Sequence, residues 1–261
     1  MSLDWIAAEL AAWEAAGLRR RLTPGLGAMG PVVHPDGREL VNFASNDYLG
    51  LASDPRLAEA AIGACRATGV GRGSSPLICG RSEVHVELER RLAAFEGVEA
   101  ALLFPSGFAA NSGTIPALVG PGDAVFSDAR NHASIIDGCR LSGAAIHVTP
   151  HNDPAALDAL LREQAGCHRR LLIATDTLFS MDGDLAPMAE IAVLAARHGA
   201  MLLVDEAHAT GVLGRLGRGG VELAAERRPE LAELLERTVH VRVGTLSKAL
   251  GTAGGFVAGT R

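Results

Sequence analysis

The single lysine of the chain, Lys248, is the side chain best suited to covalent chemistry. The 261 residues include 24 lysines and arginines, and all but Lys248 are arginine. Arginine replaces lysine well on a solvated surface, but its guanidinium stays protonated and supplies no neutral amine to a carbonyl carbon. A genome that favours arginine codons explains the bias but not the lysine that remains. Lys248 is therefore the first candidate for attaching a carbonyl compound.

Other reactive or polar side chains follow several short apolar runs. Asp205 closes the run MLLVD, and His208 stands three residues further on. Ser106, Gly107 and Phe108 follow the run AALLF and precede a helix expected to start near residue 109. A glycine turn at a helix N-terminus offers backbone N–H groups and a positive dipole end to a phosphate. The remaining candidates are a loop imidazole and two hydroxyls: His132, Ser180 and Thr245.

Together these side chains meet the four demands of pyridoxal phosphate. That cofactor needs an amine for its aldehyde, an anion beside its pyridine nitrogen, donors for its phosphate and a flat group against its ring. Lys248 supplies the amine, and the Asp205 carboxylate keeps the nitrogen protonated because it stabilises the pyridinium form. His208 can hydrogen-bond the ring hydroxyl oxygen, and His132 can lie flat on the ring. Taken singly, these residues have plainer interpretations, such as a surface lysine, an N-cap aspartate or an ordinary loop histidine.

The elements that position these residues are short apolar runs alternating with helical stretches. The runs predict strands over residues 100–104, 124–127, 145–148, 171–175, 201–204, 239–244 and 255–258. The stretches between them predict helices, among them 83–97, 154–164, 187–198 and 221–237. This alternation is typical of an α/β domain with a mostly parallel sheet and helices on both faces. Ligands of such sheets bind beyond the carboxyl ends of the strands, where most of the candidates stand.

The apolar residues of the N-terminal part follow a different pattern from those of the rest of the chain. Ile6, Leu10, Trp13 and Gly17 recur at helical spacing, which predicts an amphipathic helix over residues 4–21. A loop rich in glycine and proline follows over residues 23–37. We therefore expect an N-terminal helix and connecting segment over residues 1–40 and one large α/β domain over residues 41–261.

Composition argues against several classes of protein. A net charge of −6 and a pI near 5.8 disfavour a surface that collects nucleic acid or anionic lipid. No run approaches the ~18 apolar residues of a membrane span, and the N-terminus lacks the features of a signal peptide. The four cysteines have no metal-binding spacing. These features predict a cytoplasmic protein with reduced cysteines, no metal, and neither nucleic acid nor membrane as a partner.

Two nucleotide-binding motifs match the sequence, but the residues around each match do not fit the structure that the motif requires. Residues 25–30 fit GxGxxG, but Pro24 precedes and Pro31 follows the match, where a dinucleotide site needs a strand and then a helix. Residues 205–208 spell DEAH, but the chain has no GxxxxGK[ST] upstream of it. Neither match predicts a nucleotide site.

Seven segments carry a family resemblance. They include SNDYLGL (45–51), FPSGFAAN (104–111), FSMDGDLAP (179–187), DEAHATGVLG (205–214) and GTLSKALG (244–251), with matching stretches at 71–89 and 127–140. In this order and spacing the chain resembles the α-oxoamine synthase family of fold-type I pyridoxal-phosphate enzymes. The resemblance implies the large domain of that fold.

The resemblance also implies a role for individual residues. Lys248 would hold the cofactor, Asp205 would face the pyridine nitrogen, His208 would contact the ring oxygen and His132 would stack on the ring. Backbone groups of Gly107 and Phe108, with Ser180 and Thr245, would add cofactor contacts. Arg19 matches an arginine that contacts the acyl substrate, and Asn46, like His132, falls at the substrate site. Asp176 stands where many members carry glutamate.

The implied activity is that of an acyltransferase with Lys248 as nucleophile, base and acid in turn. Within the family the chain is most similar to the branch of biotin biosynthesis, which condenses L-alanine with a pimeloyl thioester of coenzyme A or acyl carrier protein and releases CO₂. Sister enzymes that use glycine or serine, and a non-catalytic protein of the same fold, stay open as alternatives.

Full-length members continue past the lysine into a small C-terminal domain and form homodimers. From the resemblance we expect this chain to be a partial one, without the arginine that holds the amino-acid carboxylate, and to bind the cofactor weakly at most.

Overall fold

The computed structural model describes residues 3–22, 24–25 and 27–260. The chain divides into two compact units, Met1–Ala44 and Ser45–Arg261. The expected boundary after residue 40 falls inside the first unit and stays a prediction. Residues 23 and 26, which belong to the predicted loop and to the GxGxxG match, lie outside the described residues.

The first unit holds one helix and a small antiparallel pair. Helix α1 spans Asp4–Ala15, strand β1 (Val32–Val33) pairs with β2 (Leu40–Val41), and a 3₁₀ turn, η1, spans Pro35–Gly37. The prediction that the first helix runs to residue 21 is wrong. The helix stops where Gly17 takes a left-handed φ of 67°, a conformation that favours glycine and ends helices.

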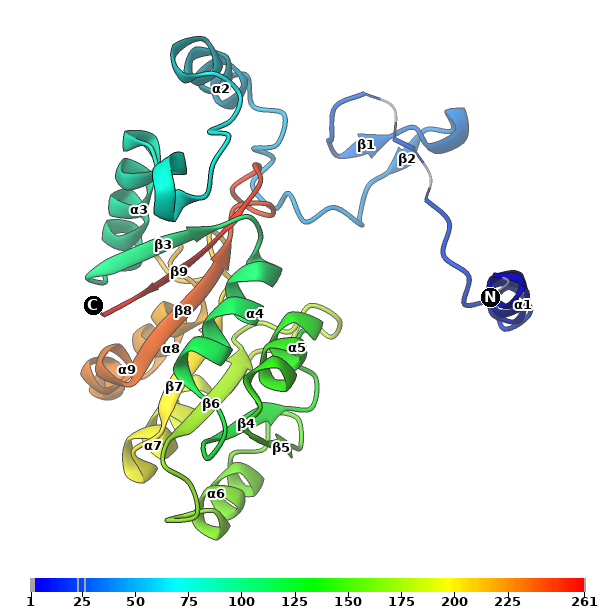
Figure 1. Cartoon of the computed structure of the whole chain (residues 1–261). Coiled ribbons are helices and arrows are strands. Elements are labelled where there is room, and N and C mark those ends of the chain that lie inside the picture. Colours follow the sequence, from blue (N-terminus) through cyan, green and yellow to red (C-terminus); the bar gives the residue numbers. More distant parts are fainter. Residues whose placement is uncertain (1–2, 23, 26, 261) are drawn as a thin grey trace. The chain divides into compact units, whose positions relative to one another are not determined.

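The second unit carries a seven-stranded sheet (Figure 1). Its strands are β3 (Ala100–Phe104), β4 (Ala124–Asp128), β5 (Ala145–Thr149), β6 (Leu171–Asp176), β7 (Met201–Asp205), β8 (Val239–Thr245) and β9 (Gly255–Gly259). All seven begin at the predicted residue, and all but β3 end one residue later than predicted. The strand order is β3-β9-β8-β7-β6-β4-β5, with β9 antiparallel to both of its neighbours and the run from β8 to β5 parallel. The predicted, mostly parallel sheet is confirmed.

Helices occupy the segments between the strands. They are α2 (Pro55–Thr68), the π turn η2 (Pro76–Gly80), α3 (Glu83–Glu96), α4 (Gly107–Leu118), α5 (Ala133–Ser142), α6 (Pro154–Glu163), α7 (Met188–His198), α8 (Gly220–Arg227), the 3₁₀ turn η3 (Pro229–Leu231) and α9 (Ala232–Thr238). The helix predicted over residues 221–237 is instead broken into α8, η3 and α9. Arg228 precedes Pro229 and leaves the helical region at φ −130° and ψ 69°, because proline disfavours a helical residue before it.

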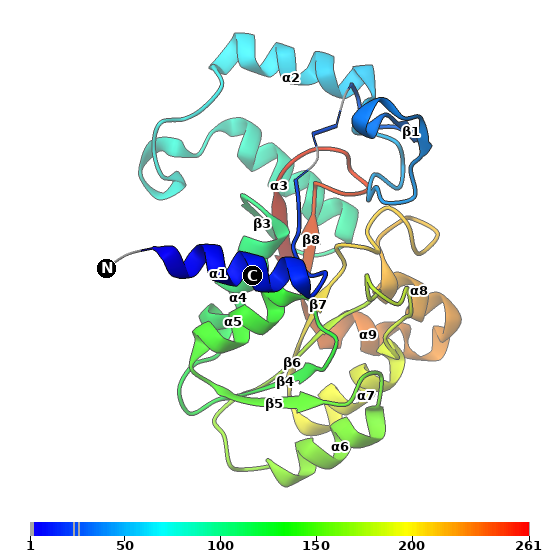
Figure 2. The ribbon, with the colours of Figure 1, turned by 90° about the vertical axis from the view of Figure 1, so that its right-hand side faces the viewer.

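Successive strand residues enter two different cores, so both faces of the sheet are covered. Val125 and Leu172 join α4 and α5 in one core, whereas their neighbours Phe126 and Ile173 join α6, α7, α8 and α9 in the other. Figures 1 and 2 show these two groups of helices on opposite sides of the sheet. The predicted fold class, the large domain of the fold-type I enzymes, has this arrangement.

One buried carboxyl makes a pH-dependent contribution to stability. Glu96, at the end of α3, is 2% exposed, and neither of its carboxyl oxygens has a hydrogen-bond partner among the described residues. Burial, followed by the charge of Glu206, raises the pKa of Glu96 to about 8 against the opposing effect of Arg242 and Arg218. The folded chain therefore holds a proton that the unfolded chain releases from about pH 4.5 upward.

We expect Glu96→Gln to stabilise the protein increasingly as the pH rises from about 4.5 to 8. The glutamine stays neutral, whereas the wild type loses roughly 1.4 kcal/mol per pH unit over this window as an upper limit. Urea unfolding of both proteins at pH 5 and pH 8 measures the difference. An advantage of the variant that is equal at both pH values would contradict the assignment.

Candidate active site

The carboxyl ends of the neighbouring parallel strands β4, β6, β7 and β8 present polar residues at one edge of the sheet. Asp176 at the end of β6 is the register partner of Asp205 at the end of β7. Asp128 ends β4, and Thr245 ends β8. The sheet thus brings together residues that lie up to about 120 positions apart in the chain, as ligand sites of this fold class require.

Lys248 lies three residues after β8 and enters a chain of hydrogen bonds. Its Nζ is 2.8 Å from His208 Nε2, and His208 Nδ1 is 2.7 Å from the hydroxyl of Tyr48. The Tyr48 hydroxyl also donates to Asn46 Oδ1 at 3.2 Å. The structure therefore places three predicted site residues, Lys248, His208 and Asn46, on one network. Tyr48, which the sequence analysis did not single out, joins them and lies in the SNDYLGL segment.

Burial shifts the pKa of each titratable group of this network towards its uncharged form. It lowers the pKa of Lys248, although the charges of Asp205 and Asp176 oppose the shift. Burial, then the positive charges of Lys248 and His132, lowers the pKa of His208 to about 4. Burial also raises the pKa of Tyr48. At neutral pH His208 is a neutral imidazole with one donor and one acceptor nitrogen, and it can therefore accept a hydrogen bond from the Lys248 amine.

Asn111 holds one oxygen of the Asp205 carboxyl group by a hydrogen bond. This asparagine, on the face of α4 that meets the sheet, donates from Nδ2 to Asp205 Oδ2 at 2.6 Å and to Ser134 Oγ at 3.0 Å. Ser134 Oγ in turn lies 2.7 Å from His132 Nδ1. The other Asp205 oxygen accepts from the backbone N–H of Ala207 at 2.8 Å, within the turn that follows β7 and not at the start of a helix. Asn111 and Ser134, both missed from the sequence, tie Asp205 to His132.

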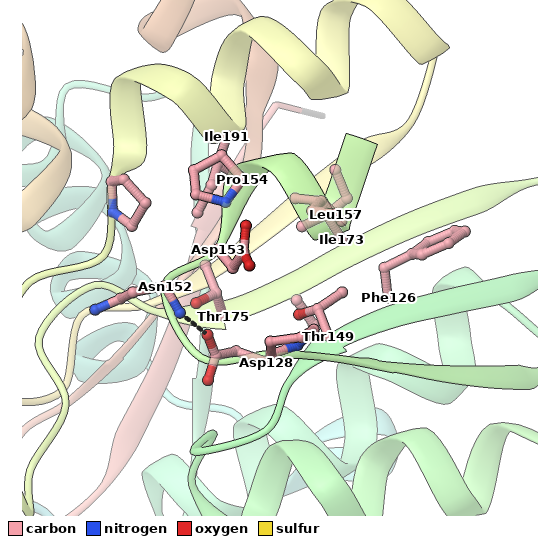
Figure 3. A pocket seen from close by; sticks show the side chains of 13 residues that line it. Phe126, Asp128, Thr149, Asn152, Asp153, Pro154, Leu157, Ile173, Thr175 and Ile191 are labelled. Atoms are coloured by element: carbon pink, nitrogen blue, oxygen red, sulfur yellow. Dashed lines mark hydrogen bonds between the residues drawn. The ribbon is translucent and has the colours of Figure 1, made fainter. Parts of the chain in front are cut away.

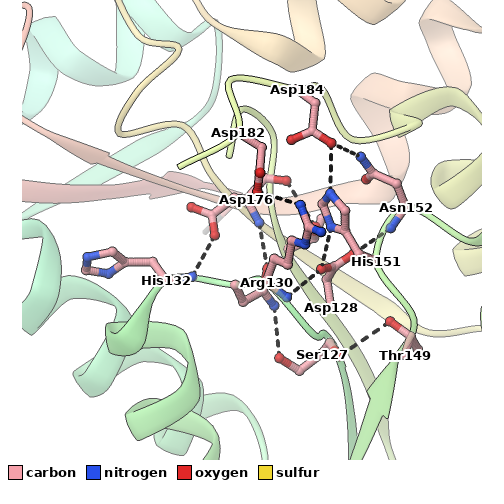
Figure 4. Close-up of polar contacts among 12 residues, drawn as sticks. Ser127, Asp128, Arg130, His132, Thr149, His151, Asn152, Asp176, Asp182 and Asp184 are labelled. Carbon is pink, nitrogen blue, oxygen red and sulfur yellow. Dashed lines mark hydrogen bonds and ion pairs between the residues drawn. The ribbon is translucent and has the colours of Figure 1, made fainter. Parts of the chain in front are cut away.

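Asp176 orients the loop that carries His132. Its Oδ2 accepts the backbone N–H of His132 at 2.8 Å (Figure 4). Burial, then the charge of Asp205, raises the pKa of Asp176 well above its ordinary value. The Asp176 carboxyl therefore favours its protonated form beside Asp205. The His132 ring meets Phe108 edge to face, with ring centroids 6.4 Å apart.

The start of α4 lies against the end of β8 and the start of β9. A Cβ added to Gly255 would lie 2.4 Å from the backbone nitrogen of Gly107, and one added to Gly107 would lie 3.3 Å from Thr245 Cβ. Glycine at 255 is thus needed for the close approach. Ser106 caps α4 by accepting the N–H of Ala109 at 3.1 Å. Gly107, Phe108 and Thr245 consequently gather at a helix N-terminus suited to a phosphate.

Two predicted residues are not joined to this set. Ser180 is exposed on the hairpin after β6, and no hydrogen bond links it to the other candidates within the described part of the chain. Arg19 belongs to the first unit, where its guanidinium pairs with Glu14 at 3.0 Å. The roles of both residues stay predictions.

A small cavity close to the site is too small for a cofactor. It is enclosed by the end of β4, the start of α6 and the start of α7, and its volume is about 20 Å³ (Figure 3). Asp128, Thr149 and Asn152 line it, but Lys248, Asp205 and His132 do not. Among the described residues no cluster of three metal-ligating side chains could hold a metal ion, and no helix is long and apolar enough to cross a bilayer.

The side chains at the sheet edge fit pyridoxal phosphate. An amine with a lowered pKa, a buried carboxylate, two imidazoles and a helix N-terminus with a hydroxyl stand together, as that cofactor requires. The family model for aminotransferase class I and II matches residues 38–261. The chain belongs to this family.

Two relatives of known sequence indicate which enzyme of the family this chain resembles. The chain is 56% identical to the 8-amino-7-oxononanoate synthase of Anaeromyxobacter sp. strain Fw109-5, over 99% of its own length and 62% of that protein. It is 51% identical to the enzyme of the same name from Symbiobacterium thermophilum, over 99% and 64%. The chain thus spans less than two thirds of the length of these relatives.

Solved structures of other proteins share the fold. A Sphingomonas wittichii serine palmitoyltransferase superposes with a TM-score of 0.88 at 34% identity, over 99% of this chain and 64% of that one. An 8-amino-7-oxononanoate synthase from Francisella tularensis superposes with a TM-score of 0.67 at 29% identity, over 84% and 58%. Another serine palmitoyltransferase structure is described with an internal aldimine of PLP. The resemblance to the α-oxoamine synthases, their fold and their cofactor is confirmed by these relatives.

Proposed function

We propose that this chain binds pyridoxal phosphate and takes part in the decarboxylative condensation of L-alanine with a pimeloyl thioester, which gives 8-amino-7-oxononanoate, CO₂ and a free thiol. The observation that carries the proposal is the sole lysine, partly buried, bonded to a neutral histidine and lying at the strand edge that presents Asp205. The relatives that carry the name of this synthase support the choice of reaction.

The contacts of each residue suggest its role in the proposed reaction. Lys248 Nζ would attach the cofactor and later take and return the proton at the substrate α-carbon. Asp205, fixed by Asn111, would hold a proton on the pyridine nitrogen. When bound, the cofactor supplies an electron sink for negative charge on that carbon.

The remaining site residues would orient the cofactor and the substrates. His208 and His132 would contact the ring, and Gly107, Phe108, Thr245 and Ser180 would contact the phosphate or nearby atoms. Arg19, Asn46 and His132 would contact substrate. We further propose coenzyme A or acyl carrier protein as the acyl carrier, a homodimer as the assembly of the full-length protein, and the cytoplasm as its location.

A second candidate is a sister reaction with serine, favoured by the close superposition on serine palmitoyltransferase. Amino-acid titration of the cofactor-loaded chain separates the two. We expect L-alanine to change the cofactor absorbance at a lower concentration than glycine or L-serine. We also expect the mass of 8-amino-7-oxononanoate to accumulate with a pimeloyl thioester. A clear preference for serine or glycine would assign the chain to a sister reaction.

A further inference from the structure

The hairpin that carries Ser180 is anchored at its base. Leu178 and Leu185 form an antiparallel bridge, and the N–H of Gly183 donates to Phe179 O at 2.8 Å. Phe179 is 2% exposed in the core, whereas Met181 at the tip is 91% exposed. The hairpin thus needs a further attachment if Ser180 is to keep a fixed position at the sheet edge.

His151, just after β5, supplies that attachment. Its Nδ1 is 2.9 Å from Asp128 Oδ1 at the end of β4, and its Nε2 is 2.8 Å from Asp184 Oδ2 in the hairpin (Figure 4). Its side chain is 16% exposed, and its ring packs against the Phe179 ring in a T-shaped arrangement, with ring centroids 4.5 Å apart. The imidazole therefore bridges two separate segments.

The two bonds require a protonated ring. A neutral imidazole donates from one nitrogen only, whereas two carboxylates accept and do not donate. Burial lowers the pKa of His151, but the hydrogen bonds to Asp128 and Asp184 outweigh burial and raise it. Asp128 and Asp184 are the charged groups that contact the ring. Near them, Arg130 of the His132 loop forms an ion pair with Asp182 of the hairpin.

The neighbouring residue strengthens the same connection. The N–H of Asn152 donates to Asp128 Oδ2 at 2.9 Å, and its side-chain amide donates to Asp184 Oδ2 at 2.9 Å. Asn152 adopts a left-handed φ of 51°, a conformation that asparagine tolerates better than most residues.

Asp128 also organises the loop on its own side. Its Oδ1 accepts the N–H of Arg130 at 2.8 Å, in the turn that leads to His132. His151 and Asn152 therefore connect the loop of His132 to the hairpin of Ser180, both of which carry residues of the proposed cofactor site.

We propose that His151 is a positioning residue, which in its protonated form bridges Asp128 and Asp184 and so fixes the Ser180 hairpin against the His132 loop. The link to the cofactor rests on the proposed function, whereas the bridge itself does not. A group with a raised folded pKa contributes its full stabilisation below its unfolded pKa, about 6.5, and loses it as the pH rises through the folded value. The bridge should weaken accordingly in alkaline solution.

Hydrogen exchange of the cofactor-free chain tests the bridge. For the wild type we expect the protection of the amides of residues 178–185, corrected for intrinsic exchange, to fall between pH 6 and pH 9. In His151→Gln we expect protection at pH 6 to be at least about tenfold lower and independent of pH, because glutamine has both N–H groups on a single nitrogen and no positive charge, so it does not reproduce a bridge made from two opposite ring nitrogens. Hairpin protection within twofold of wild type at pH 6 would overturn the proposal.

His198→Gln provides the matched control. His198 ends α7, its side chain is 12% exposed, and its Nε2 lies 2.8 Å from Asp158 Oδ1, away from the hairpin. We expect this variant to leave hairpin protection unchanged. An equal loss in the control would mean a general destabilisation and would also overturn the proposal.

Titration with pyridoxal phosphate tests the positioning role. We expect His151→Gln to raise the Kd about three- to tenfold without moving the absorbance maximum. A loosened hairpin with an unchanged Kd would overturn the positioning role. If the wild-type chain bound no pyridoxal phosphate, the proposed function would fail, and the exchange experiment would still decide whether His151 forms the bridge.

Discussion

Lys248→Arg is expected to abolish covalent attachment of pyridoxal phosphate and to lower turnover at least about 10³-fold. The guanidinium keeps the positive charge and much of the length of the side chain, but it cannot present a neutral nitrogen to an aldehyde. In the wild type, burial lowers the pKa of the Lys248 amine and so increases the fraction that is nucleophilic. Comparison of Lys248→Arg with the wild type therefore separates the need for a neutral amine from the need for a positive charge at this position.

Borohydride reduction followed by peptide mapping measures the attachment. In the wild type the cofactor should be fixed on the peptide that contains Lys248. The chain has no second lysine, so a label elsewhere could arise only adventitiously, for example at the N-terminal amine, which serves as an internal control. If Lys248→Arg retained the visible absorbance and the reducible link of the wild type, Lys248 would not be the attachment site.

The strands and the edge that carries the site could be predicted because their signals are local. Each strand is an apolar run, such as 201–204, and Asp205 is the polar residue that closes this run at the end of β7. The parallel arrangement then places Asp205 and Thr245 at one edge without any knowledge of side-chain packing.

The supporting residues could not be predicted because their partners are distant in the sequence. Asn111 binds Asp205 across 94 positions, and Tyr48 binds His208 across 160. No periodicity encodes such pairs, and as single polar residues Asn111, Tyr48 and His151 resemble ordinary helix or loop residues. Helix α5 was not among the helices named from the sequence, and the buried Ser134 and Ser142 interrupt its apolar face.

Asp205→Asn is expected to cost far more activity than cofactor binding. The asparagine keeps one oxygen for the Asn111 amide, and the helix N-terminus of α4 and Thr245 are untouched, so the Kd for pyridoxal phosphate should change less than about tenfold. The negative charge is lost, however, and with it the stabilisation of a protonated pyridine nitrogen. Turnover should fall at least about a hundredfold, as for the loss of one preorganised electrostatic partner.

Glu206→Gln is the matched control for this charge. Glu206 is the adjacent carboxylate, 1% exposed, but it points to the N-terminus of α8, where it accepts the N–H groups of Gly220 at 2.8 Å and Val221 at 3.0 Å. Its replacement should lower the unfolding midpoint and leave turnover per bound cofactor nearly unchanged. If Asp205→Asn behaved like Glu206→Gln, with reduced stability and near-normal turnover, the Asp205 charge would have no part in activating the ring. The carboxylate would then be a structural partner of Asn111 and Ala207 only.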